Sequence, residues 1–262
     1  MNRLAAKILK NIPSVMSNPR RAWRLLSRRL VPMGVMWTDP DAYQVVGSRT
    51  FGRAPRVALV DAFPGIAALD VCILRAFDRS LETSLSPHEA LALAAIGKFT
   101  NPRRILEIGT FDGNTTLNLA ANSPPDAAIT TVDLPPDWTG TLTYQVPGLL
   151  ENFTGPASAA AQFRNTGYAN KIRQVYGDSA AIDWAELGGP FDLIFIDGSH
   201  YYEYVKSDTR NALRCLTAGG LVVWHDYGMI EDVSRAVDEV ANAVRVFAIR
   251  GTRLAVGRPG QA

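Results

Sequence analysis

The apolar residues of this chain fall into two kinds of segment that alternate along most of its length. Short runs of branched and aromatic residues predict strands, and their lack of polar interruptions is typical of a parallel sheet covered on both faces. Longer segments with apolar residues at every third or fourth position predict helices. The predicted parallel strands are residues 105–108, 127–132, 172–176, 191–196 and 221–224. The predicted helices are residues 66–81, 86–99, 114–120, 201–216 and 230–244.

The end of the chain departs from this alternation. Residues 244–249 and 253–256 have the pattern of strands, and the turn at 250–252 is too short for a crossover. The two strands are therefore expected to pair antiparallel. Residues 56–60 are a weaker candidate for one more short strand. Five parallel strands and a terminal hairpin predict an α/β domain with helices on both faces of its sheet.

Two helix boundaries carry clear signals. Ser86 is a good N-cap, Pro87 suits the first helical position, and Glu89 follows three residues after the cap, which makes a capping box. We expect His88, in the same turn, to lie on the surface. The glycines within residues 218–220 predict the C-cap of the helix at 201–216.

One strand–turn–helix unit, residues 104–116, organises the rest of the chain. The strand ends at Ile108, the turn has a glycine at each end (Gly109 and Gly113), and a helix begins at Asn114. Glycine lets the backbone approach a ligand closely, and a helix N-terminus offers free N–H groups. The unit is therefore a candidate nucleotide cradle.

The turn does not have the residues that bind a pyrophosphate. Phe111 stands where the dinucleotide fingerprint has its second glycine, and no lysine follows Gly113 as a P-loop requires. Glu107, at the end of the strand, would repel a phosphate but accepts hydrogen bonds from ammonium or hydroxyl groups. The ligand is therefore expected to be cationic or rich in hydroxyls, such as S-adenosylmethionine.

Five successive strands or strand candidates end in a carboxylate. The carboxyl ends of parallel strands face one crevice. Unpaired carboxylates in one crevice repel each other, so a cation or hydrogen-bond donors are expected there. An aspartate after a strand is also a common helix cap, which is the structural alternative for any one of them. The five are Glu107, Asp133, Asp178, Asp197 and Asp226, with His200 and His225 beside the last two.

The glycine turn resembles a known motif. It follows the pattern Glu-x-Gly-x-aromatic-x-Gly-x-Ser/Thr, read here as Glu107, Gly109, Phe111, Gly113 and Thr115. This resembles the first motif of the class I S-adenosylmethionine-dependent methyltransferases, closest to the small-molecule O-methyltransferases that include catechol and macrolide-sugar enzymes. The resemblance covers about residues 85–258 and implies a Rossmann-like sheet of seven strands. The alternative is a glycine turn in another doubly wound α/β protein.

The resemblance also implies where the cofactor lies. The methionine part is expected beside the glycine turn, the ribose at Asp133, and the adenine near Asp178 and Ser179. An aromatic face can attract the sulfonium charge, and the candidates for that role are Phe111, Tyr202 and Trp224. The full set of candidate cofactor-binding residues is Glu107, Gly109, Thr110, Phe111, Gly113, Thr115, Asp133, Asp178, Ser179 and Asp197.

The last two strand ends are expected to serve the acceptor. In the related O-methyltransferases, acids at the ends of the fourth and fifth strands hold Mg²⁺, and Asp197 and Asp226 match those positions. Oxygen ligands suit Mg²⁺, which acts as a Lewis acid toward a bound hydroxyl. In the sugar enzymes that the Asp-Gly-Ser-His segment resembles, the histidine, here His200, is the general base. An ordinary imidazole pKa of about 6.5 suits that role.

His225 departs from the sugar enzymes, which carry two adjacent acids at the end of the fifth strand. It is therefore a nitrogen ligand, an orienting partner of Asp226, or a sign that the metal site is weaker or lost. Histidine is a softer ligand than a carboxylate, and it favours Mn²⁺ or Zn²⁺ over Mg²⁺.

Charge is unevenly distributed over the 262 residues, whose formal net charge is +2. Residues 1–38 contain no acidic residue, so we interpret residues 1–55 as a basic, partly helical extension ahead of a domain at 56–262. A basic amphipathic helix can lie on an anionic membrane surface or hold an acidic partner. The alternative is an arm that packs on its own domain or on a second subunit. The mildly acidic remainder argues against a nucleic-acid-binding protein.

Cys72 and Cys215 have no partner at metal-binding spacing and lie in apolar helical patterns, so buried free thiols are expected. No apolar stretch has the length of a membrane helix. Lys7 and Lys10 interrupt the only candidate for a signal sequence. The protein is therefore expected to be cytoplasmic.

The sequence predicts an enzyme that transfers a methyl group from S-adenosylmethionine to a hydroxyl of a small molecule, a sugar or a secondary metabolite. Residues 134–170, with only a short helix predicted at 159–165, are either a lid or substrate loop or a surface insert. Two alternatives stand beside this function: a non-catalytic scaffold on the same fold, and a non-methylating enzyme such as the relatives associated with antibiotic hydroxylation. His200 favours an enzyme, because a binding protein has no use for a base beside a metal site.

Overall fold

A single sheet runs through the computed structural model, which describes residues 48–75, 85–146, 161–241 and 243–259. Its strands are β1 (Arg56–Val57), β2 (Arg104–Ile108), β3 (Ala128–Asp133), β4 (Ile172–Tyr176), β5 (Phe191–Ile196), β6 (Leu216–Trp224), β7 (Val244–Ile249) and β8 (Ala255–Pro259). Their order across the sheet is β1-β7-β8-β6-β5-β2-β3-β4. Neighbours pair parallel, except that β8 pairs antiparallel with both β6 and β7.

The predicted α/β fold with a terminal antiparallel hairpin is confirmed, with one strand more than the seven predicted. The additional strand, β1, is the weak candidate at 56–60. It pairs with β7 through Arg56 and Val57 only. The chain then turns into the short helix α4 (Leu59–Ala62), so the strand prediction was wrong beyond residue 57.

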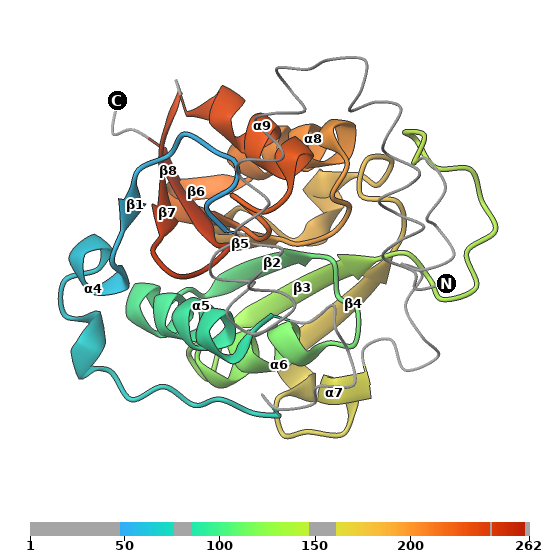
Figure 1. Cartoon of the computed structure of the whole chain (residues 1–262). Helices are drawn as coiled ribbons and strands as arrows, with labels where there is room; N and C mark the ends of the chain where they lie inside the picture. The colour runs from blue at the N-terminus through green and yellow to red at the C-terminus, as the bar shows by residue number, and fades with distance from the viewer. Residues whose placement is uncertain (1–47, 76–84, 147–160, 242, 260–262) are drawn as a thin grey trace, which may run out of the picture.

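Helices cover both faces of the sheet (Figure 1). Helices α5 (Pro87–Thr100) and α6 (Asn114–Ala121) lie on one face, and α8 (Tyr202–Arg214) and α9 (Glu231–Val240) lie on the other. The shorter helices are α7 (Ala161–Arg164) and the 3₁₀ turns η1 (Ile66–Ala68), η3 (Ala169–Lys171) and η4 (Trp184–Leu187). The capping box of α5 is present as predicted, and His88 is exposed.

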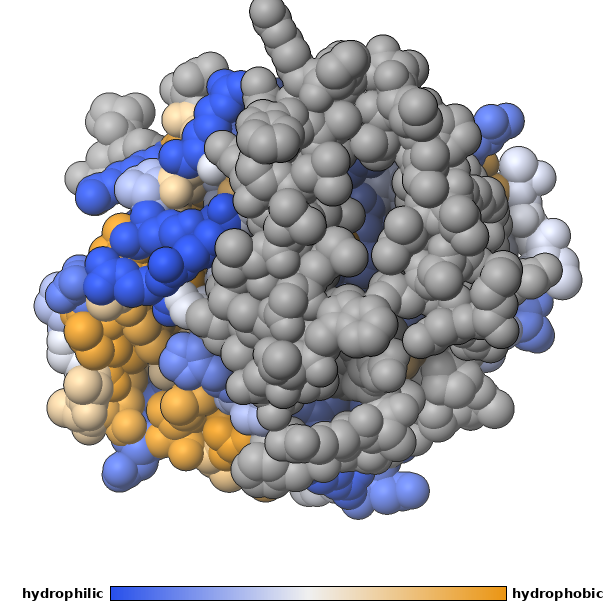
Figure 2. All heavy atoms as spheres, viewed as in Figure 1, coloured by the Kyte–Doolittle hydropathy of each residue, from blue (hydrophilic) through white to orange (hydrophobic). Residues whose placement is uncertain are grey.

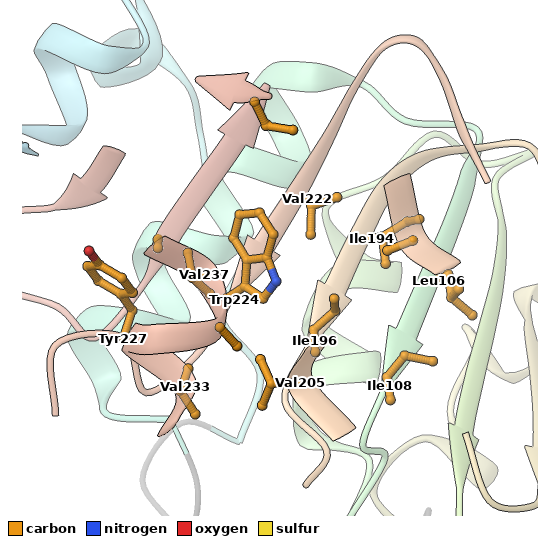
Figure 3. Packing of buried hydrophobic residues seen from close by; sticks show 14 of the residues in the cluster. Leu106, Ile108, Ile194, Ile196, Val205, Val222, Trp224, Tyr227, Val233 and Val237 are labelled. Carbon is orange, nitrogen blue, oxygen red and sulfur yellow. The ribbon is translucent and has the colours of Figure 1, made fainter. Parts of the chain in front are cut away.

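Alternate residues of the central strands belong to two separate cores, as the two-residue period of a strand requires. On the α5 and α6 face, Ile105, Leu193 and Val223 pack against Leu93 and Ile96. On the opposite face, the indole N–H of Trp224 donates to Thr209 Oγ1 at 2.9 Å. Figure 3 shows that face, with Leu106, Ile108, Ile194, Ile196, Val222 and Trp224 beside Val205, Val233 and Val237.

The helix predicted at 66–81 was wrong over residues 69–75, because Asn118 of α6 and Asn122, its C-cap, bind the backbone groups that a helix would use; residues 76–81 lie outside the described residues. Asn122 accepts from the N–H of Cys72 at 2.9 Å and donates to its carbonyl at 2.7 Å. Asn118 binds the N–H and carbonyl of Leu74 in the same way. This extended backbone leaves Cys72 exposed, so the expectation of a buried thiol there was also wrong.

Two other boundaries differ from the prediction. Helix α8 ends at Arg214, and the glycines at 218–220 lie inside β6 rather than at a C-cap. The register between β5 and β6 shifts at this point, and Gly219 has a φ of +86°, which glycine adopts without strain. The helix predicted at 230–244 ends at Val240, and Val244 begins β7 instead.

Residues 48–57 lie against the loop that follows β6. The N–H of Phe51 donates to the carbonyl of Gly228 at 2.8 Å, and the N–H of Ala54 donates to the hydroxyl of Tyr227 at 2.8 Å. That hydroxyl donates in turn to Asp238 of α9 at 2.6 Å. The described end of the N-terminal extension is therefore fastened to the loop that carries His225 and Asp226.

The rest of the basic extension, residues 1–47, lies outside the described residues, as does part of the 134–170 connection. The described part of that connection has no strand; it contains α7, at 161–164, where the sequence predicted a short helix, and the start of η3 at Ala169. No helix among the described residues is long and apolar enough to cross a membrane. Figure 2 shows hydrophobic residues at the surface beside α4 and α5, where Val60, Leu91 and Phe99 are exposed.

Candidate active site

A cavity of about 740 Å³ lies at the carboxyl ends of the parallel strands. Its wall includes the turn after β2 and the residues that follow β3, β4, β5 and β6. A volume of this size is in the range of pockets that bind small molecules and cofactors. The cavity therefore lies where the sequence predicted the ligand.

The glycine turn brings the backbone of β2 close to the end of β5. Gly109 has a φ of +99°, and a Cβ atom at this position would lie 2.2 Å from the carbonyl oxygen of Asp197. Gly113, with a φ of +84°, is the N-cap of α6. Phe111, between them, has a φ of +49° and donates its N–H to Asp133 Oδ2 at 2.7 Å. The turn thus needs glycine where the sequence has it.

Glu107 does not reach the cavity wall. It is fully buried behind the turn, where Oε2 accepts from the hydroxyls of Thr116 and Thr131. Its other oxygen, Oε1, has no hydrogen-bond partner among the described residues. Burial raises the pKa of Glu107 to about 8, although the two hydroxyls oppose this rise. The carboxyl therefore belongs to the support of the turn in this structure.

Asp133 and Asp178 line the cavity and are held by neutral donors. Asp133 accepts from the N–H groups of Phe111 and Leu134, both at 2.7 Å. Burial raises its pKa, and these bonds oppose the rise. Asp178 Oδ2 accepts from the N–H of Thr143 at 2.8 Å and from the hydroxyl of Tyr204 at 3.0 Å. Backbone and hydroxyl donors thus fix both carboxylates in place.

Asp208 of α8 is a buried carboxylate close to Asp178. The Ser179 hydroxyl is near enough to favour the charged form, but neither oxygen of Asp208 reaches hydrogen-bond geometry with a donor in the described chain. Burial raises the pKa of Asp208 from 3.8 to about 7, and the charge of Asp178 adds to the rise. Below about pH 7 the protonated form is therefore favoured in the folded protein.

The second half of the site is a cluster of charged side chains from four segments of the chain. His200 Nε2 lies 3.0 Å from Asp226 Oδ2 and 3.8 Å from Asp197 Oδ1. His225 Nδ1 lies 3.0 Å from Asp197 Oδ1. Arg253 NH1 donates to Asp226 Oδ1 at 2.7 Å. Each of the two aspartates at the ends of β5 and β6 therefore has a basic partner.

Glu89 closes the cluster from the start of α5. Oε2 accepts from Arg253 NH2 at 2.7 Å and lies 3.4 Å from His225 Nε2. Oε1 accepts from Arg253 Nε at 2.9 Å. Glu89 is 1% exposed, so its carboxylate depends on these partners rather than on water.

The charges of the cluster shift one another. Burial opposes the charged form of every member, but the opposite charges overcome it. The carboxylates of Asp197 and Asp226 raise the pKa of His200 to about 9 and that of His225 to about 10. The histidines, with Arg253 beside Asp226, hold the pKa values of both aspartates below their ordinary range.

Ten of the predicted site residues line the cavity. They are Gly109, Thr110, Phe111, Thr115, Asp133, Asp178, Ser179, Asp197, His200 and Asp226. The three not found in the wall are Glu107, Gly113 and His225.

The three aromatic residues considered as partners of the sulfonium differ in whether they face the cavity. Phe111 lines the cavity, whereas Trp224 is fully buried in the core. Tyr202 points away, and its hydroxyl donates to Glu239 on α9. The suggestion that Tyr202 or Trp224 faces the ligand was therefore wrong, because Tyr202 is turned toward α9 and Trp224 packs in the core beneath α8 and α9.

Sequence reasoning missed Glu89 and Arg253 as site residues. Glu89 was explained fully by its role in the capping box, which it also fills: Oε2 accepts from the N–H of Ser86 at 3.0 Å. Arg253 was assigned only to the terminal hairpin. The only local signal was an arginine directly before the apolar run 254–256, which by itself does not distinguish a buried from a solvated charge.

Comparisons with known proteins agree with this geometry. Residues 106–227 match a family model described as a methyltransferase domain. The catechol O-methyltransferase of Mycobacterium tuberculosis is 28% identical over 184 residues, which are 70% of this chain and 70% of the relative. The O-methyltransferase hkm8 of Aspergillus hancockii is 30% identical over 144 residues, which are 54% of this chain and 49% of the relative.

Two solved structures share the fold. The O-methyltransferase TomG from Streptomyces achromogenes, in complex with SAM, is 20% identical with a TM-score of 0.52, and the match covers 77% of this chain and 96% of TomG. The O-methyltransferase from Bacillus cereus, in complex with SAH, is 16% identical with a TM-score of 0.52, covering 78% of this chain and 90% of the other.

Gly109→Ala is expected to destabilise the protein more than Gly188→Ala. Both glycines have φ above +90°, which costs an L-residue roughly 1–2 kcal/mol. Only at position 109 does the new Cβ collide with backbone, at Asp197. Thermal unfolding of the two variants checks this, and equal losses of stability would contradict the close approach of the turn to β5.

Asp208→Asn is expected to stabilise the protein more at pH 8 than at pH 5. Because the pKa of Asp208 is higher in the folded state, the folded protein binds more protons between pH 3.8 and about 7. Its stability therefore falls as the pH rises through this range, and asparagine removes that loss. Thermal unfolding at the two pH values measures the effect, with the exposed Asp70→Asn as the control. A difference from the wild type that does not change with pH would contradict it.

Proposed function

We propose that this chain, a class I S-adenosylmethionine-dependent O-methyltransferase, methylates a hydroxyl of a sugar or a secondary metabolite with His200 as the general base and with the assistance of a divalent metal ion. The observation that carries the proposal is the pairing of His200 with Asp226 in the wall of the cavity that the glycine turn borders. A base beside a carboxylate in a ligand pocket suits removal of a proton from a hydroxyl.

The cofactor is proposed to bind along the first three strand ends. The backbone of the turn offers close approach at Gly109, and Phe111 supplies an aromatic face. Asp133 and Asp178 keep carboxylate oxygens at the cavity wall, which suit the ribose hydroxyls and the adenine amino group as acceptors. Neutral donors hold both side chains, so they are fixed before the ligand arrives.

The second half of the cavity contains donors that suit a divalent metal ion. One ligand atom each from Asp197, His225 and Asp226 can be chosen so that all lie within 4.8 Å of one another. When both imidazoles are neutral, three carboxylates (Asp197, Asp226 and Glu89) face one guanidinium, which leaves two negative charges. A divalent ion would balance them. When bound, such an ion would act as a Lewis acid on the acceptor hydroxyl.

The proposed base and the proposed metal support each other. His200 can accept a proton only when its imidazole is neutral, and the two aspartates stabilise the charged form. Positive charge on the same aspartates would oppose that effect and lower the pKa of His200 toward neutrality. After the proton has moved, Asp226 stabilises the imidazolium that forms.

His200→Ala is expected to lower kcat by about 10² to 10⁴, because it removes the positioned base. The rate would be measured with S-adenosylmethionine, Mg²⁺ and the acceptor that a panel of catechols and glycosides identifies. Calorimetry with S-adenosylmethionine alone should show unchanged binding. The exposed His88→Ala is the control, and wild-type turnover by His200→Ala would refute the assignment of the base.

Asp197→Asn is expected to weaken metal binding, because it replaces a charged oxygen ligand with a neutral amide. Binding of Mn²⁺, measured by electron paramagnetic resonance, should be lost in this variant and kept in Glu203→Gln, on the first turn of α8. If wild type and Asp197→Asn bind Mn²⁺ equally, the proposed metal site is wrong. The proposal for cofactor binding does not depend on this result.

A further inference from the structure

We propose that Arg253, held by Glu89, positions Asp226 for its partner His200. Neither residue belongs to the strand ends that border the cofactor: Glu89 comes from the first turn of α5, and Arg253 comes from the turn between β7 and β8. The inference rests on the proposed function, since it explains how the base is oriented. It assigns to both residues a role in holding the reacting group rather than in touching the acceptor.

Arg253 is bound by two carboxylates at once. Its Nε and NH2 groups donate to Oε1 and Oε2 of Glu89, a two-pronged contact at 2.9 and 2.7 Å. Its backbone N–H also donates to Glu89 Oε1, at 2.8 Å. The remaining arm, NH1, donates to Asp226 Oδ1 at 2.7 Å. These contacts fix the plane of the guanidinium, because arginine binds a carboxylate with two parallel bonds.

As a consequence, the two carboxylate oxygens of Asp226 have different partners. Oδ1 is taken by Arg253, and Oδ2 lies 3.0 Å from His200 Nε2. A carboxylate with only one partner is free to turn about its last bond. With Arg253 in place, the oxygen that faces His200 is fixed before any acceptor binds.

Glu89 reaches the other half of the cluster as well. Its Oε2 lies 3.4 Å from His225 Nε2, and the opposite ring nitrogen lies 3.0 Å from Asp197 Oδ1. The start of α5 therefore connects to both aspartates, through Arg253 on one side and His225 on the other. The Glu89 side chain thus helps to orient both halves of the cluster.

Packing alone does not explain this arrangement. Replacing a buried ion pair with apolar side chains of similar volume is often neutral or stabilising, so stability gives little reason to keep one. Arg253 lies in the cavity wall, and its Nε, NH1 and NH2 groups are all directed at carboxylates. The buried guanidinium of Arg253 therefore serves to orient the carboxylates at the cavity wall.

The chain offers a matched pair of variants, because Glu89 has two separable roles. Glu89→Gln keeps the shape and the capping box, which glutamine also forms, but removes the charge that holds Arg253. Ser86→Ala does the reverse: it removes the cap hydroxyl, together with its 2.9 Å hydrogen bond to Glu89 Oε2, and leaves the carboxylate charge that holds Arg253. Arg253→Met removes the guanidinium itself, and Arg250→Met, at an exposed position of the same turn, is its control.

The test is the imidazole ¹⁵N spectrum of histidine-labelled full-length protein, recorded without acceptor. The chain has three histidines, and the exposed His88 is an internal reference. We expect shifted His200 signals in Arg253→Met and Glu89→Gln, and wild-type signals in Ser86→Ala and Arg250→Met. In turnover, kcat of the first two variants should fall about 10- to 100-fold with the KM for S-adenosylmethionine unchanged.

Unchanged His200 signals in both Arg253→Met and Glu89→Gln would overturn the inference. Equal changes in Ser86→Ala and Glu89→Gln would also overturn it, because Glu89 would then act through the helix start. The spectra need no turnover, so they remain decisive if the wild type methylates none of the acceptors tested. Failure of the wild type to methylate any acceptor would instead count against the proposed function.

Discussion

A parallel sheet places the carboxyl ends of its strands along one edge, and in this protein that edge gathers several carboxylates. Each must be compensated where water is excluded, because burial disfavours the charged form. The rest of the site follows from this constraint. Threonine hydroxyls donate to Glu107, and backbone N–H groups and a tyrosine hydroxyl donate to the carboxylates after β3 and β4. Arg253, from the terminal hairpin, donates to Asp226.

The two halves of the edge meet the constraint in different ways. Asp133 and Asp178 are held by neutral N–H and hydroxyl donors, so their oxygens stay available to a ligand that carries donors. Asp197 and Asp226 are held by charged partners, among them His200 and Arg253. Neutral partners suit recognition, whereas charged partners can exchange protons or be replaced by a cation. The half of the cavity proposed to bind the cofactor and the half proposed to hold the reacting groups thus differ in the chemistry of the partners that hold their carboxylates.

The sequence predicted most of the fold and the row of strand ends at which the candidate site lies. The turn at 109–113 was identified because a buried strand that ends at one glycine, with a helix that begins after a second, is typical of a ligand cradle. The carboxylate at each strand end was identified because the topology follows from the order of strands and helices. The helix predicted at 66–81 was wrong over residues 69–75, because Asn118 and Asn122, which bind the backbone at Leu74 and Cys72, are distant in the sequence.

The sequence by itself thus determined which residues stand at the ends of the strands, since that depends on local patterns and the rule that parallel strands end at one edge. Only the tertiary structure decided which way their side chains point and what meets them. Glu107 turns inward to two threonines, and Trp224 turns into the core. Glu89 and Arg253, 164 positions apart, bind each other, and Arg253 binds Asp226. Such contacts depend on how helices and hairpin pack, and no local pattern specifies a partner that far along the chain.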